Sequence, residues 1–558
     1  MFRVRTLAGI VSIMFAFVAG SGLRDASIAA DTLQYLDGGS WVVVGSGTDA
    51  PAPFGAQVPG DLITDMERAG IVADPLVDNN FLLPLWDVRD FTYSTTFVAN
   101  EAVVALNTVF LVLDGIKMVA DITFNGISLG FIDNSFLRFS YDISSIVSRT
   151  GEPNVLAVAF TTSNDTRNKP GRWSACSGGW DWAPISNTMV SPGDPFGDLA
   201  TFSKGIWKSV YLAGVVSAAI MHVVPAVTYG GVYPTEPLTD GSSGPFHVRV
   251  KVALRVPRAT SGTLSVAGSW GGINSTASVH VALPANDTDV LLHLDADPSR
   301  ITLWWPVGMG GHQLYEVRAV FTPDAAPDAS VEATRRIGFR IVTIVSADDS
   351  NPGRIAGVDG SGNFTMRLRV NGANIWSRGS NFVPMEEMEG RSTAEAHVQL
   401  MRSAAEAGMN TLRIWGGGIW QYDAFYDAAD ELGVLLYHDA AVSEPNGSVS
   451  FVAVVPRAAE DRLMSTTVSN PSPHNMACST HRVATRQMKL RDTSPKNCSI
   501  KSGASRITRQ SPSGTRAMNA AAAVITRRSS WRPSSQKTKA GLYGPRAPRT
   551  AGSLAWTA

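Results

Sequence analysis

The sequence predicts a multidomain chain of the β plus α/β class, with two β-sandwiches followed by a (β/α) barrel that is incomplete. Short alternating apolar runs separated by turn residues fill residues 31–345. Strand and helix patterns then alternate over residues 346–440, and periodicity is lost over residues 441–558. With 558 residues, 44% of them hydrophobic and 17% charged, the chain can form several such cores.

The first 30 residues have the pattern of a secretory signal peptide. Arg3 and Arg5 precede an apolar run from Leu7 to Ala19, and small residues follow. This run is too short to cross a bilayer and no stop-transfer pattern follows it, so we expect a cleaved leader and no membrane span. Five N-glycosylation patterns fit the same route: Asn164, Asn274, Asn286, Asn363 and Asn446. With only three cysteines and no disulfide framework, we expect a secreted or lysosomal protein held together by its cores.

Residues 31–215 are predicted to form a β-sandwich or jelly roll. Apolar residues alternate from Ala102 to Leu113, from Val119 to Phe124 and from Val155 to Thr161. Asn125-Gly126 is a hairpin signal between two such runs.

Residues 216–345 repeat this pattern on the scale of an immunoglobulin-like sandwich. The expected strands include His247 to Val256, Gly262 to Ala267, Val290 to Leu294 and Arg335 to Val345. Between them, Leu303-Trp304-Trp305-Pro306 is expected to cover one edge with bulky aromatic side chains.

Residues 346–440 are predicted to form about three parallel βα units. A strand pair around Asn371-Gly372 and a strand from Ile375 to Val383 precede a capping box, Ser392-Thr393-Ala394-Glu395, and a helix ending at Gly408. The unit that organises the chain spans Asn410–Asp439. It comprises a strand to Trp415, a helix from Asp423 to Leu432 and a strand from Val434. A closed barrel needs eight such units, so the barrel is incomplete.

The carboxyl ends of these parallel strands predict an active face. Catalytic and binding groups of (β/α) barrels gather there, so Arg413, Trp415 and Asp439 are expected to point at a substrate. Three glycines follow Trp415, which suits close approach of backbone to a ligand. The alternative is that these are packing residues at a strand end.

The last part of the chain differs in charge from the rest. Residues 451–558 hold 18 of the 47 basic and 3 of the 48 acidic residues, a net charge of about +15. Stacking aromatics between the basic groups are nearly absent, so we expect a disordered tail and no nucleic-acid partner.

Seven motifs in order resemble the β-mannosidases of glycoside hydrolase family 2. They are Val58-Pro59-Gly60, Ala120-Asp121-Ile122-Thr123-Phe124-Asn125-Gly126, Gly179-Trp180-Asp181-Trp182-Ala183-Pro184, Gly205-Ile206-Trp207-Lys208, Leu303-Trp304-Trp305-Pro306 with Leu314-Tyr315, Asn381-Phe382-Val383-Pro384, and Arg413-Ile414-Trp415-Gly416-Gly417-Gly418. The resemblance covers about residues 33–439. It implies a sugar-binding-like jelly roll, an immunoglobulin-like domain and a (β/α)8 catalytic barrel.

The resemblance also implies a function and a site. The function is exo-hydrolysis of terminal non-reducing β-D-mannose from N-glycans or mannans, without cofactor or metal. Trp180 and Asp181 resemble the family's sugar-binding loop, Trp415 its sugar platform, and Arg413 the group that orients the nucleophile. The alternative for the loop is that Trp180 and Trp182 are core aromatics and Asp181 a turn residue.

The two catalytic glutamates of the family have no counterpart in this chain. The acid/base lies in a Trp-x-x-x-Asn-Glu string, which is absent, and the nucleophile lies farther on; Glu444 and Glu460 match neither context. The genetic code suggests why. Read one nucleotide out of register, Met518 and Asn519 encode a Glu, and the shifted codons of residues 507–522 permit a family-like acid/base motif.

A second family-like string is permitted over residues 542–557 in the same shifted frame. Two such strings indicate a change of frame between about Ala440 and Arg506. The nucleotide sequence tests this: codons 507–522 must yield the peptide in the shifted frame. The predicted protein is therefore a retaining β-mannosidase by descent, inactive as written. The alternative from another class is a non-catalytic carbohydrate-binding module in which the two sandwiches fold alone.

Overall fold

The computed structural model describes most of the chain up to Asp439. The described residues are 25, 27–78, 80, 85–86, 89–117, 119–161, 203–345, 347–348, 351–355, 367–416, 418–439 and 452–453. Of the signal peptide predicted for residues 1–30 the structure describes residues 25 and 27–30, where Asp25 pairs with Lys208 and Ile28 is buried. Of the tail predicted for residues 441–558 it describes residues 452 and 453 alone. No helix among the described residues has the length and apolarity needed to span a membrane.

The first sandwich packs a four-stranded sheet against a six-stranded one. The smaller sheet has the order β1 (Thr32–Tyr35), β12 (Val210–Val215), β5 (Thr108–Leu113), β9 (Phe139–Asp142). The larger has the order β3 (Phe54–Val58), β2 (Gly38–Gly45), β4 (Phe91–Phe97), β10 (Asn154–Phe160), β7 (Ala120–Phe124), β8 (Ile127–Ile132). The short pair β6 (Ile116–Lys117) and β11 (Gly205–Ile206) and the helices α1 (Leu62–Arg68) and α2 (Glu101–Val104) complete it.

Local chemistry explains why these strands form. In β7 and β10 every second residue is buried, as a sheet with one face on the core requires. The predicted hairpin joins β7 to β8, with Asn125 and Gly126 both at positive φ (49° and 77°). The predicted strand from Ala102 was wrong at its start: residues 101–104 form α2, because only Val103 of that turn is buried.

The second sandwich consists of two antiparallel sheets around its own core. Their orders are β13 (Ala219–Tyr229), β14 (Phe246–Arg255), β17 (Asp287–Ala296) and β16 (Ile273–Leu283), β15 (Thr260–Trp270), β18 (Tyr315–Pro323), β19 (Val331–Ile337), with the turn η3 (Pro298–Arg300). The strand expected from Arg335 to Val345 is two strands, β19 and β20 (Val342–Val345). Phe339 and Ile341, in the link between them, are buried in this core.

The third part begins with small antiparallel sheets and continues as a parallel one. β20 pairs with the hairpin β23 (Arg367–Val370) and β24 (Ala373–Ile375), whose turn is Asn371-Gly372, and β21 (Ala347–Asp348) pairs with β22 (Asn351–Ile355). The parallel strands are β25 (Gly379–Phe382), β26 (Thr411–Ile414) and β27 (Leu435–Asp439), and β28 (Val452–Ala453) joins β27 antiparallel. The strand expected from Ile375 to Val383 is therefore divided between β24 and β25.

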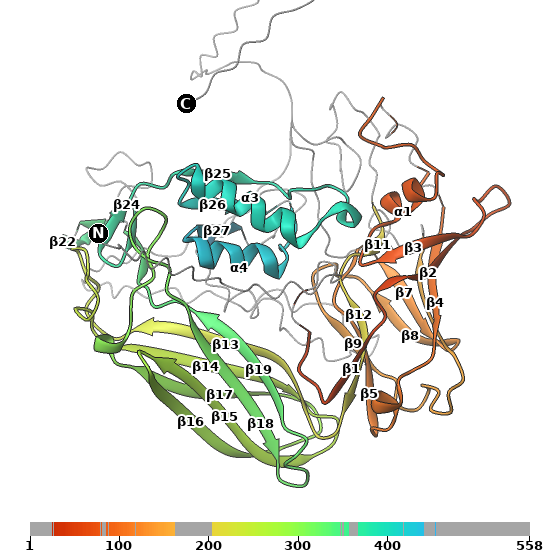
Figure 1. Cartoon of the computed structure of the whole chain (residues 1–558), viewed down its shortest axis with the longest axis horizontal. Coiled ribbons are helices and arrows are strands. Elements are labelled where there is room, and N and C mark those ends of the chain that lie inside the picture. Colours follow the sequence, from red (N-terminus) through yellow and green to blue (C-terminus); the bar gives the residue numbers. More distant parts are fainter. Residues whose placement is uncertain are drawn as a thin grey trace, which may run out of the picture. The chain divides into compact units, whose positions relative to one another are not determined.

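Two helices accompany the parallel strands, α3 (Ala394–Glu406) and α4 (Asp423–Leu432), which pack side by side (Figure 1). The bounds of α4 match the prediction, and it ends at Gly433 in the left-handed conformation. The cap of α3 is Thr393, whose hydroxyl accepts from Ala396 N–H, so the predicted box headed by Ser392 does not form. The three parallel strands and two helices agree with the predicted βα units, and the described residues contain no closed barrel.

Candidate functional site

Polar side chains meet at the carboxyl ends of the three parallel strands. The register places Asn381 of β25 beside Arg413 of β26. The Arg413 guanidinium donates to both carboxylate oxygens of Asp439 at the end of β27, from Nε at 3.3 Å and from Nη2 at 2.6 Å. Its Nη1 donates to Asn381 Oδ1 at 3.1 Å. One guanidinium therefore joins all three strands.

The loop after β26 is tied to the same carboxylate. Gly416 N–H donates to Asp439 Oδ2 at 3.1 Å. A Cβ at Gly416 would lie 3.0 Å from the Asp439 Cβ, so the close approach suits a residue without a side chain. Trp415, just before it, is half-buried, and its N–H is bonded to the Phe382 carbonyl of β25. The loop thus fixes the backbone from which the Trp415 indole projects.

Burial makes this ion pair asymmetric. The Asp439 side chain is 7% exposed, whereas that of Arg413 is 34% exposed. The guanidinium is therefore held from one side and reaches solvent on the other. A charged donor in that position can bind hydroxyl or carboxylate oxygens of a ligand.

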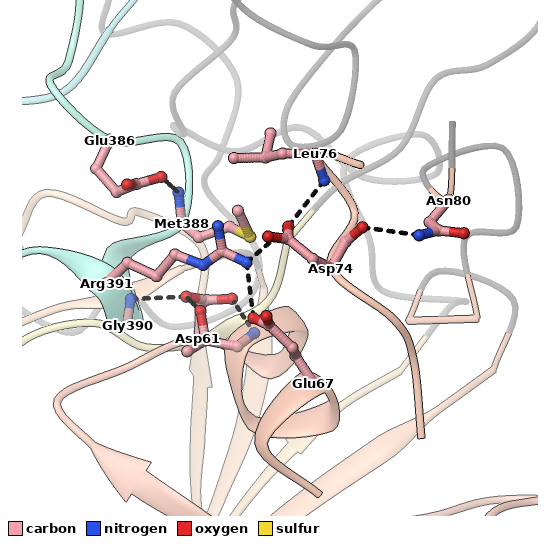
Figure 2. Close-up of polar contacts among 10 residues, drawn as sticks. Asp61, Glu67, Asp74, Leu76, Asn80, Glu386, Met388, Gly390 and Arg391 are labelled. Atoms are coloured by element: carbon pink, nitrogen blue, oxygen red, sulfur yellow. Dashed lines mark hydrogen bonds and ion pairs between the residues drawn. The ribbon is translucent and has the colours of Figure 1, made fainter. Parts of the chain in front are cut away.

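A second polar contact joins the first sandwich to the loop between β25 and α3 (Figure 2). We call it the α1–η4 contact, because α1 meets the short turn η4 (Glu389–Arg391). Asp61, the N-cap of α1, accepts from Gly390 N–H at 2.6 Å. Arg391 Nη2 lies 2.7 Å from Glu67 and 2.9 Å from Asp74.

Beneath this contact is a buried ion pair, Lys117–Glu389, whose side chains are 3% and 5% exposed. Burial raises the pKa of the Glu389 carboxyl, and the Lys117 ammonium opposes that rise. Met388, the residue just before Glu389, is fully buried in the core of the first sandwich. The first βα loop of the barrel segment is thus anchored in the sandwich.

The other barrel loop is also tied to the first sandwich. Asp25 accepts from the N–H of Asp423 at the start of α4 (2.8 Å) and pairs with Lys208 (2.5 Å). Trp207 packs edge to face on Tyr422, with ring centroids 5.4 Å apart. Together with the α1–η4 contact, this fixes both loops beside the strand ends.

The structure brings together some of the predicted site residues and does not describe others. Arg413, Trp415 and Asp439 lie at one edge of the sheet, as their place on parallel strands predicted. Trp180 and Asp181, and the acceptor residues Asn164, Asn363 and Asn446, lie outside the described residues. Asn274 and Asn286 are exposed, and the Thr288 hydroxyl donates to Asn286 Oδ1 at 2.9 Å.

Sequence reasoning missed Asn381 as a member of the site. Its signal was present, since it lies one residue before the end of the strand preceding Arg413. The resemblance implied that Arg413 orients a catalytic nucleophile. In the structure its guanidinium is bonded to the Asp439 carboxylate. Among the described residues no group of three or more His, Cys, Asp or Glu could hold a metal ion.

The match to a known family lies in the first sandwich. A family model described as "Glycosyl hydrolase 2 galactose-binding domain-like" matches residues 41–191, most of the first sandwich. The described part of the chain has this sandwich, a second sandwich and parallel βα units in sequence. The first sandwich is thus similar to the galactose-binding-like domain of the family 2 glycosyl hydrolases.

The similar proteins are more specific. β-Mannosidase of Mus musculus is 26% identical in an alignment of 435 positions that covers 73% of this chain and 45% of that protein. β-Mannosidase A of Aspergillus aculeatus is 26% identical in an alignment of 427 positions that covers 70% of this chain and 42% of that protein. The chain spans about half the length of the curated relatives it matches.

A solved structure has the same fold. The β-D-mannosidase of Dictyoglomus thermophilum aligns with a TM-score of 0.60 and 23% identity, over 74% of this chain and 49% of that one. The exo-chitosanase CsxA of Amycolatopsis orientalis aligns with a TM-score of 0.50. The predicted resemblance to β-mannosidases of glycoside hydrolase family 2 is thus confirmed.

Proposed function

We propose that this chain is a β-mannosidase-type glycoside hydrolase by descent, whose whole-protein reaction is the exo-hydrolysis of terminal non-reducing β-D-mannose. The observation that carries the proposal is the Arg413–Asp439–Asn381 cluster at the carboxyl ends of three parallel strands. Its substrate would be a β-mannoside oligosaccharide from N-glycans or mannans. The similarity to curated β-mannosidases over about three quarters of the chain supports this substrate class.

The proposed mechanism is that of a retaining glycosidase. It needs one carboxylic acid to protonate the leaving oxygen and a second, about 5–5.5 Å away, to attack the sugar carbon. In this proposal Trp415 is the platform beneath the sugar, and Trp180 and Asp181 bind it from the first domain. Arg413, which is open to solvent on one side, orients oxygens at the reacting centre.

We further propose that a polypeptide of this sequence does not turn over β-mannosides. The acid/base string Trp-x-x-x-Asn-Glu occurs nowhere in the 558 residues. Asp439, the carboxylate at the end of β27, is bonded to Arg413 and Gly416 and its side chain is 7% exposed. Loss of a general acid alone lowers rate by about 10²–10⁴-fold, and loss of a nucleophile adds to this.

The experiment compares turnover with binding. The chain is incubated with 4-nitrophenyl β-D-mannoside and, in parallel, applied to immobilised β-mannan. We expect retention on the mannan without release of nitrophenol. Trp415→Ala should abolish retention. The control Trp376→Ala should not, because Trp376 is 83% exposed and precedes β25, whereas the candidate site lies at the carboxyl end of that strand. Turnover by this chain contradicts the proposed inactivity, and absence of retention contradicts the proposed sugar site.

The second candidate, a carbohydrate-binding module made of the two sandwiches alone, meets a structural difficulty. A fragment ending before the barrel segment would lack Glu389, the ion-pair partner of Lys117, and Met388, which is buried in the core of the first sandwich. The contacts therefore support a binding unit that includes the barrel segment at least to Arg391.

We also propose that the chain enters the secretory pathway and acts outside the cell or in the lysosome. The leader-like apolar run from Leu7 to Ala19 and the exposed acceptors Asn274 and Asn286 support this. Several buried carboxyls have a raised pKa, among them that of Asp65, raised by burial to about 6. Groups of this kind make the folded state more stable at acidic than at neutral pH, which suits an acidic compartment.

A further inference from the structure

The strongest remaining feature is a buried histidine directly behind the Arg413–Asp439 pair. His438, on β27, is 2% exposed. The Trp420 ring stacks on it, with centroids 4.4 Å apart and an interplanar angle of 24°. Its Nε2 lies 2.9 Å from the Tyr426 hydroxyl on α4, and its Nδ1 lies 2.7 Å from the Asp439 carbonyl oxygen.

These partners determine the tautomer of His438. A carbonyl oxygen can only accept, so Nδ1 carries the proton, and Nε2 must accept from the Tyr426 hydroxyl. That hydroxyl in turn accepts from Gln421 N–H at 3.1 Å. Every bond in the series has one direction: Gln421 to Tyr426, Tyr426 to His438, and His438 to Asp439.

The surroundings of His438 favour the neutral ring. Burial lowers the pKa of His438, while the hydrogen bond to the Asp439 carbonyl opposes the decrease. Protonation would place a second N–H against the Tyr426 hydroxyl, which would then have to reverse its own bond. A neutral ring with a fixed tautomer is therefore the form that fits this site.

The series ends at the residue that holds Arg413. His438 bonds to the carbonyl of Asp439, and the carboxylate of the same residue bonds to Arg413 and to Gly416 N–H. Trp420 and Gln421 belong to the loop that also carries Gly416. The histidine thus connects the two sides of this arrangement, the end of β27 and the loop after β26.

We propose that His438 is a positioning residue that, through Asp439, holds Arg413 in the orientation in which it binds sugar. The sugar-binding part rests on the proposed function; the positioning of Arg413 does not. Because Arg413 is 34% exposed, it has few other restraints, and loss of Asp439's orientation would release it to solvent. This role depends on both hydrogen bonds of the His438 ring and not only on the space that the ring fills.

The test uses three variants with a matched control. His438→Gln replaces the imidazole ring by an amide side chain. Tyr426→Phe removes only the hydroxyl that bonds to Nε2, and His438→Asn keeps an N–H donor near the Nδ1 position. Tyr422→Phe is the control. Tyr422 is also buried beside α4, but its hydroxyl has no hydrogen-bond partner among the residues that the structure describes.

The first measurement is nuclear magnetic resonance of the full chain labelled at His and Arg. We expect the His438 ring to show the Nδ1–H tautomer, and the Arg413 Nε–H, identified by its loss in Arg413→Lys, to be protected from exchange. Tyr426→Phe and His438→Gln should speed that exchange by about threefold to tenfold, the range for loss of one net hydrogen bond. His438→Asn should recover part of the protection, and Tyr422→Phe should leave it unchanged.

The second measurement is binding of methyl β-D-mannoside by calorimetry. The same two variants should weaken binding by a similar factor at unchanged fold, checked by circular dichroism. Unchanged Arg413 exchange in both variants, or an Nε2–H tautomer, overturns the proposal. If the unaltered chain binds no mannoside while Arg413 exchange responds as expected, the positioning role is supported and the proposed sugar site fails.

Discussion

The buried pair Lys117–Glu389 allows a quantitative prediction. Glu389→Gln removes the negative charge that, within the described part of the chain, is bonded to the Lys117 ammonium, whose side chain is 3% exposed. Removing one partner of a buried pair typically costs about 3–5 kcal/mol, because the other charge keeps its desolvation penalty. We therefore expect the free energy of unfolding of the first sandwich to fall by about 3–5 kcal/mol.

The double replacement Lys117→Met with Glu389→Leu separates charge from packing. With both charges gone, neither desolvation penalty is left, and replacing buried pairs by apolar residues is often neutral or stabilising. The double variant should therefore be more stable than Glu389→Gln alone. Lys251→Met is the control, since the Lys251–Asp289 pair is partly exposed (19% and 59%) and should be worth less than about 1 kcal/mol.

The assay is urea unfolding, with hydrogen exchange used to assign the transition to a part of the chain. A chain of several cores need not unfold in one step, so the exchange of peptides covering α1 and β6 is followed at each urea concentration. A loss below about 1 kcal/mol in Glu389→Gln, or a double variant as unstable as the single one, would refute the reasoning.

Two further predictions concern pH and backbone strain. Burial raises the pKa of Asp65 to about 6, so between pH 4 and 6 the folded state binds more protons than the unfolded state. Stability should fall by about 3 kcal/mol as pH rises through this window, and Asp65→Asn should remove that part of the slope in urea unfolding at pH 4.5 and 7.5. Gly433→Ala should destabilise by about 1–2 kcal/mol or more, because φ is 78° and the new Cβ would lie 2.2 Å from His312. Gly408→Ala introduces the same backbone strain (φ 77°), but its new Cβ would have no atom within 4 Å. If thermal melts show the same loss of stability for both variants, the His312 contact is excluded as a cause.

Much of the fold could be predicted because its signals are local. Asn125-Gly126 and Asn371-Gly372 are followed by hairpins, since both residues of each pair adopt positive φ. The bounds of α4 were predicted because Gly433 ends it in the left-handed conformation. The cap of α3 was misjudged because Ser392 and Thr393 are both good caps, and only the backbone geometry distinguishes them.

The contacts around the candidate site were less predictable. Parallel strand ends indicated that Arg413 and Asp439 would meet, and they do. No local pattern could indicate that Glu389 would pair with Lys117, 272 residues earlier, or that Met388 would enter the core of the first sandwich. Such pairs depend on how separate elements pack, which hydrophobic periodicity does not encode.

The anchoring of Met388 in the first sandwich has a consequence for biosynthesis. The last strand of that sandwich, β12, ends at Val215, yet its core is completed by a residue roughly 170 positions later. At a translation rate of about 5–20 residues per second, this delay is roughly 10–30 s. During that interval the nascent sandwich lacks Met388 and the partner of Lys117, so the apolar site that the barrel segment later fills is open to water, and exposed apolar surface of this kind favours aggregation.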